Sequence, residues 1–164
     1  MTSAVLDEAM KKAALAWISV GDGPALALWC MPLDGALIVV SGEGEQFAPG
    51  LADATRAVVR LRGDNGGLIV VSEMAVARIL PGSEDWDTVA PQLAGKRLNA
   101  SGSADDVVAR WVSSGAVVVR LTPDDPSPVV APDLPSGTGA EPLRETPAVV
   151  PVRKPFKLHK VRKR

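Results

Sequence analysis

Residues that can bind an anion are grouped at three places in the chain, and the first is a glycine-rich loop. Its sequence is Ser41-Gly42-Glu43-Gly44-Glu45-Gln46. Glycines allow backbone N–H groups to approach an oxyanion closely, and Ser41 and Gln46 add side-chain donors. Glu43 and Glu45 repel an anion unless they point away from it. The loop therefore predicts either an anion site on Ser41, Gly42, Gly44 and Gln46 or a mobile connector between two strands.

The other two places carry paired basic residues. Arg60 and Arg62 alternate with apolar residues, so they share one face of a strand, where two guanidinium groups suit a phosphate or carboxylate. A solvated strand face is the alternative. Lys96 and Arg97 follow a predicted helix, where cations either stabilise the helix C-terminus or reach a cofactor phosphate. Trp29, in the second predicted strand, is the tryptophan that we single out as a stacking surface for a planar ligand.

The residue types that most enzymes use for acid–base or nucleophilic chemistry are scarce. The chain has no tyrosine, its single histidine is His159, and its single cysteine, Cys30, lies in an apolar run. The predicted folded part therefore holds no Ser-His-Asp triad, no Cys-His pair and no zinc site, and we expect no bound metal. If the protein is an enzyme, its reaction chemistry comes from a bound cofactor or from carboxylates and lysines. One cysteine allows no disulfide within the chain, which favours a reducing, cytoplasmic location.

Short strands joined by tight turns are predicted to position these residues. Asp34-Gly35 is typical of a type I′ hairpin. Two large aromatic residues, Trp86 and Trp111, are expected in the core. Hairpins dominate and βαβ alternation is absent. The sequence therefore predicts a mostly β protein, a six-stranded antiparallel barrel with short flanking helices. The predicted strands are residues 15–20, 25–31, 36–40, 57–62, 68–80 and 115–122, and the predicted helices are residues 3–12, 83–94 and 103–112.

The last quarter of the chain has a different composition. Nine of the 14 prolines lie between Pro123 and Pro155, a density that a packed domain rarely tolerates. We therefore predict a folded domain over residues 1–122 and a disordered, proline-rich tail over residues 123–164. Residues 153–164 contain seven basic and no acidic side chains, which suits nucleic acid or an anionic surface, although a solubilising end is equally compatible. No apolar run is long enough to predict a membrane span.

The pattern of residues 4–122 resembles the pyridoxamine 5′-phosphate oxidase-like split-barrel proteins, which bind FMN or the deazaflavin F420. The resemblance rests on the N-terminal helix, the Gly23-Pro24 turn, the Leu28-Trp29-Cys30 strand, the Asp34-Gly35 hairpin, the polar loop and residues 57–62. It implies a homodimer with the cofactor in a groove between two barrels. It also implies that Ser41, the loop of residues 42–46 and Arg60 or Arg62 hold the cofactor phosphate. Many members carry a lysine in this loop, where this chain has Glu43 and Glu45.

Two kinds of function follow from this resemblance. The first is a flavin- or deazaflavin-dependent oxidoreductase of unknown substrate, in which FMN or F420 carries hydride and the protein supplies a shaped groove and anion contacts. The second is a non-catalytic, dimeric split-barrel module for binding or interaction. In that case the basic tail of residues 153–164 is a possible anchor on nucleic acid.

Overall fold

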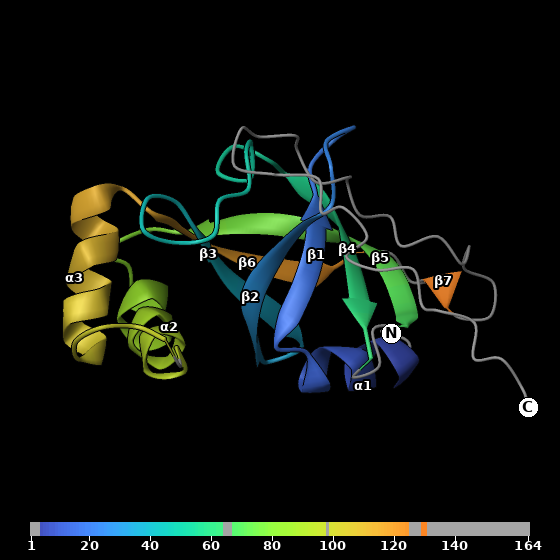
Figure 1. Ribbon diagram of the computed structural model, residues 1–164, viewed down its shortest axis with the longest axis horizontal. Coiled ribbons are helices and arrows are strands. Elements are labelled where there is room, and N and C mark those ends of the chain that lie inside the picture. Colours follow the sequence, from blue (N-terminus) through green and yellow to red (C-terminus); the bar gives the residue numbers. More distant parts are fainter. Residues whose placement is uncertain (1–3, 64–66, 98, 125–128, 131–164) are drawn as a thin grey trace, which may run out of the picture.

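The computed structural model describes residues 4–63, 67–97, 99–124 and 129–130, and its centre is a small β-barrel (Figure 1). Six strands form the barrel, one helix lies at one end, and two helices lie to one side. The strands are β1 (Leu15–Ser19), β2 (Leu26–Leu33), β3 (Ala36–Ser41), β4 (Arg56–Arg62), β5 (Leu68–Ile79) and β6 (Val117–Pro123), followed by a two-residue β7 (Val129–Val130). The helices are α1 (Ala4–Lys12), α2 (Glu84–Gly95) and α3 (Ala104–Ser114).

Every strand pair in the barrel is antiparallel. Around the barrel the order is β1-β2-β3-β6-β5-β4, and β4 pairs again with β1 to close it. Closure leaves no long open edge. The predicted six-stranded antiparallel barrel with short flanking helices is confirmed.

The turn and cap signals of the sequence act as expected. Asp34 and Gly35 both have positive φ, at 49° and 74°, as a type I′ hairpin requires. Ser103 and Asp106 form a reciprocal capping box at the start of α3. For residues 49–54 the sequence suggests a helical turn, and the structure has consecutive turns over residues 49–53.

Part of the predicted tail lies among the described residues. Pro123 ends β6, and Val129 and Val130 pair with Val71 and Val70 of β5. Residues 131–164, including the basic segment 153–164, lie outside the described residues, as do residues 64–66 of the predicted β4–β5 turn.

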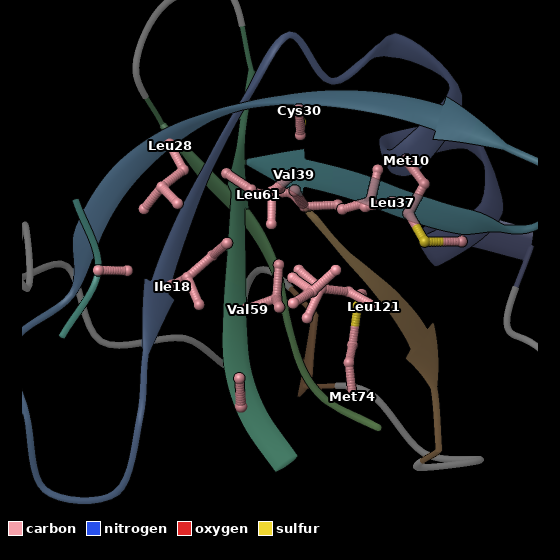
Figure 2. Close-up of a cluster of buried hydrophobic side chains, with 14 of the residues drawn as sticks. Met10, Ile18, Leu28, Cys30, Leu37, Val39, Val59, Leu61, Met74 and Leu121 are labelled. Atoms are coloured by element: carbon pink, nitrogen blue, oxygen red, sulfur yellow. The ribbon is translucent and has the colours of Figure 1, made fainter. Parts of the chain in front are cut away.

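The barrel interior is the larger of two hydrophobic cores. Side chains from all six barrel strands fill it, and α1 packs across one end through Leu6 and Met10 (Figures 1 and 2). Ile18, Leu28, Leu37, Val59, Leu61, Met74 and Leu121 are all at most 1% exposed. Such an interior is filled by its own side chains, so a ligand has to bind outside the barrel.

The second core lies on the outer face of β3, β5 and β6 and includes Met31 from the end of β2. Strand residues Ile38 and Val118 are packed there against Trp86 and Leu93 of α2 and Trp111 of α3. Trp86 and Trp111 are 5% and 2% exposed, so their expected place in the core is confirmed. We call this helix-covered surface the covered face.

Candidate functional site

A second outer face, formed by β2, β1 and β4, carries aromatic and basic side chains. Along β1, Ala16 and Ile18 point into the barrel, whereas Leu15 and Trp17 point outward. Trp29 pairs with Leu15, and Arg60 pairs with Trp17. Leu15 is 42% exposed, and the two tryptophans are half-buried. We call the surface made by Leu15, Trp17, Trp29, Arg60 and Arg62 the aromatic–arginine face. At its edge, Trp29 also packs against the core of the covered face.

One end of this face brings together three of the residues predicted from sequence. The guanidinium carbon of Arg97 lies 5.6 Å from the centre of the Trp29 ring, within the range of a cation–π contact. The backbone N–H of Trp29 donates to Oε1 of Gln46 at 2.5 Å. A shallow pocket of about 330 Å³ opens here, lined by Leu15, Trp29, Gln46, Arg97 and Asn99.

Glu45 neutralises the arginine at this end. Its Oε2 forms an ion pair with Nη1 of Arg97, and its Oε1 accepts a hydrogen bond of 2.8 Å from the indole N–H of Trp111. The side chain of Glu45 is only 6% exposed and that of Arg97 19%. A carboxylate this buried needs a charged partner, so Arg97 serves first to compensate Glu45.

The other end of the face carries the arginine pair of β4. Arg60 donates from Nη1 to Oγ of Ser19 at 2.8 Å. Arg62 lies over Trp17, with its guanidinium carbon 5.0 Å from the ring centre. Within the part of the chain that the structure describes, no carboxylate forms an ion pair with Arg60. This end therefore offers positive charge to a ligand.

The remaining predicted site residues have structural contacts. The Ser41 hydroxyl accepts a 2.8 Å hydrogen bond from the backbone N–H of Ala48, which closes the loop. A Cβ on Gly42 would lie 2.7 Å from Cα of Ala116, whereas one on Gly44 would meet nothing within 4 Å. Lys96 is exposed, and its backbone N–H caps the end of α2. None of these four lines the pocket beside Trp29.

Sequence reasoning missed several residues of this region, among them Trp17 and Glu45. Trp17 was not singled out, although its alternation with Ala16 and Ile18 in a strand places it outward. Glu45 was expected to oppose an anion, but its pairing with Arg97 depends on tertiary structure, and no local pattern in the sequence predicts it.

Cys30 and metal ligands contribute little to this surface. Burial raises the pKa of the Cys30 thiol to about 12, so the thiol is protonated and unreactive inside the barrel. Among residues 4–63, 67–97, 99–124 and 129–130, no group of three or more histidine, cysteine or acidic side chains is placed to hold a metal ion. The helices of the same residues are all too short or too polar to span a bilayer.

Comparison with solved structures identifies the architecture of the chain. No model of a protein family matches the sequence, and neither does any curated protein. Among solved structures, the chain is similar to HutZ, a heme storage protein from Vibrio cholerae, with a TM-score of 0.56 and 12% identity over 75% of this chain and 89% of that one. It is also similar to a proposed pyridoxamine 5′-phosphate oxidase from Listeria innocua, with a TM-score of 0.51 and 11% identity over 76% of this chain and 93% of that one.

The chain has the split-barrel fold. At 11–12% identity the likeness extends to the architecture, in agreement with the resemblance seen in the sequence. A protein described as heme-storing and one described as a pyridoxamine 5′-phosphate oxidase therefore share this barrel, so the ligand has to be argued from the surface residues of this chain.

Proposed function

We propose that this protein binds a flavin or deazaflavin, FMN or F420, on the aromatic–arginine face and acts as an oxidoreductase. The observation that carries the proposal is the juxtaposition of two outward tryptophans with the positive charge of Arg60, which no carboxylate of the described residues neutralises. The split-barrel fold, shared with a proposed pyridoxamine 5′-phosphate oxidase, supports it.

The residues of the face fit the two parts of such a ligand. Trp17 and Trp29 are diagonal neighbours across β1 and β2, and such neighbours lie roughly 7–8 Å apart in antiparallel sheets. Because a guanidinium group already lies over each indole ring, a fused ring would stack on these guanidinium planes and on the exposed part of the indoles. Arg60 uses one guanidinium donor for Ser19, which leaves further donors for a phosphate. The loop of residues 42–46 contributes less than the resemblance implies, because Ser41 and Glu45 are engaged within the protein.

The roles of the protein are binding and orientation. A bound flavin or deazaflavin supplies the hydride-transfer chemistry itself. Trp29 and Leu15 exclude water from one side of the ring, and Arg60 anchors the anionic end.

We further propose that the protein is a homodimer that buries this face. Leu15 is 42% exposed and Phe47, in the neighbouring loop, 66%. Exposed large apolar side chains of this kind suit an interface. Sedimentation equilibrium would measure the mass directly, and a monomer at all concentrations would contradict this part of the proposal.

The test of cofactor binding is titration of the purified protein with FMN and with F420, followed by absorbance and tryptophan fluorescence. We expect a stoichiometric complex with one of the two and quenched emission. Arg60→Gln should weaken binding of FMN about tenfold, near 1.4 kcal/mol, and leave riboflavin, which lacks the phosphate, unchanged. No binding by the wild type at tens of micromolar ligand would refute the proposal.

A non-catalytic, dimeric split-barrel module is the second candidate, and one observation favours it. Glu45 occupies Arg97, and Ser41 closes its own loop, so two of the predicted phosphate contacts are used internally. A nucleic-acid role of residues 153–164 would accompany this function. Deleting these residues and measuring DNA retention against salt tests it, since loss of phosphate contacts lowers the salt dependence of binding.

A further inference from the structure

The two ends of the aromatic–arginine face differ in charge for a reason visible in the contacts. At the Trp17 end, Arg60 is bonded to a neutral hydroxyl, that of Ser19. At the Trp29 end, the arginine above the ring, Arg97, is paired with the carboxylate of Glu45. One end is cationic, and the other is close to neutral.

Glu45 is held firmly in this position. Its two carboxylate oxygens contact Arg97 and Trp111, the next residue, Gln46, accepts from the backbone of Trp29, and Gly42 is seated directly against Ala116. The loop is therefore fixed on both sides of Glu45. Its carboxylate fills the place beside Arg97 where the phosphate or carboxylate of a ligand would otherwise bind.

We propose that Glu45 is a specificity-determining residue of this face. By supplying an internal carboxylate to Arg97, it excludes anions from the pocket beside Trp29 and leaves that pocket to an uncharged planar ring. Phosphate binding is then confined to Arg60, which fixes the direction in which a ligand lies across the face. The orientation of a flavin rests on the proposed function, whereas the exclusion of anions by Glu45 does not.

The loop offers a matched pair of variants. Glu45→Gln removes the charge but keeps an oxygen that can accept from Trp111, so Arg97 becomes available to an added anion. Glu43→Gln makes the same change in charge on the same loop at an exposed position. Any effect of net charge alone is therefore equal in the two variants.

The first experiment uses inorganic pyrophosphate, with binding followed by calorimetry and by tryptophan fluorescence. We expect Glu45→Gln to bind it about tenfold more tightly than the wild type, and Glu43→Gln to differ from the wild type by less than about twofold. Adding Arg97→Gln to Glu45→Gln should abolish the gain. Equal affinities for the Glu45→Gln and Glu43→Gln variants would overturn the proposal.

The second experiment compares FMN with riboflavin. We expect Glu45→Gln to change the ratio of their affinities and Glu43→Gln to leave it unchanged. If the wild type binds neither flavin, the proposed function fails, while the pyrophosphate experiment still decides the role of Glu45. Should Glu45→Gln not fold, Arg60→Gln gives the answer, because the proposal leaves Arg60 as the phosphate site of the wild type. Arg60→Gln should weaken pyrophosphate binding about tenfold, and an unchanged affinity would overturn the proposal.

Discussion

The barrel has two outer faces built from neighbouring strands, and they differ in what covers them. The covered face consists of aliphatic side chains such as Ile38, Val40 and Val118, packed beneath α2 and α3. The aromatic–arginine face has tryptophan, arginine and serine at the corresponding outward positions, and it remains partly open in the described residues.

The residue composition of the two faces differs because packing and ligand recognition have different requirements. A face buried by the helices of its own chain needs only apolar volume and shape. Tryptophan and arginine combine a large apolar or planar body with polar donors, and they are enriched where a surface meets a ligand or partner. The composition of the open face therefore indicates a binding surface on a barrel whose interior is already full.

The largest expected contrast comes from removing one tryptophan from each face. Trp111→Ala empties a fully buried site and should lower the free energy of unfolding by about 3–5 kcal/mol. Trp17→Ala removes a half-buried side chain and should lower it by about 1–2 kcal/mol. Urea denaturation measures both. Equal losses would mean that the open face is as important for folding as the covered face.

The loop that joins the two faces provides the second contrast. Gly42→Ala forces a Cβ to within 2.7 Å of Cα of Ala116 and should cost about 3 kcal/mol. Gly44→Ala meets no atom within 4 Å, and its φ of +77° costs roughly 1–2 kcal/mol. Thermal melts of the two variants should differ clearly. A Gly44→Ala variant as unstable as Gly42→Ala would show that the loop makes contacts at its tip.

The third test concerns the start of α3, one of the two helices that pack on the covered face. Ser103→Ala removes the N-cap of α3, whose side chain accepts from the N–H of Asp106, and should destabilise the protein by about 1 kcal/mol. Ser113→Ala, at the exposed end of the same helix, is the control and should change stability by less than about 0.5 kcal/mol.

The capping box also predicts a dependence on pH. Hydrogen bonds from the backbone and side chain of Ser103 lower the pKa of Asp106. The resulting stabilisation is present above the pKa of about 3.9 expected in the unfolded chain, and it disappears as pH falls through the lower folded value. The melting temperature of Asp106→Ala should therefore lie below that of the wild type at pH 7, and the difference should shrink as the pH falls below about 3.9. A difference that stays constant with pH would argue against the capping box.

The smallest expected effect is at Cys30, inside the barrel. Because burial raises its thiol pKa to about 12, a thiol reagent should leave the native protein unmodified at pH 8 and label it fully in urea. Rapid labelling of the native protein would mean that the barrel opens readily between β2 and its neighbours.

Local signals in the sequence were sufficient for most of the fold. Asp34-Gly35 determines a hairpin because both residues tolerate positive φ, and Ser103 with Asp106 defines a helix start through hydrogen bonds three residues apart. The candidate site was harder to predict from the sequence. Trp29 and Arg97 could be named from their residue types, but the contact of Glu45 with Arg97 and Trp111 joins distant segments and follows only from the packing of α3 against the loop.

The position of β6 in the chain has a consequence for synthesis. β6 inserts between β3 and β5, yet it follows α2 and α3 in the sequence, so it is the last barrel strand to be translated. Until it is made, the nascent sheet ends in two apolar strands with unpaired backbone groups, which are templates for pairing with other chains. The time between translation of β3 and of β6 is therefore the interval in which this protein is most exposed to aggregation and most dependent on chaperones.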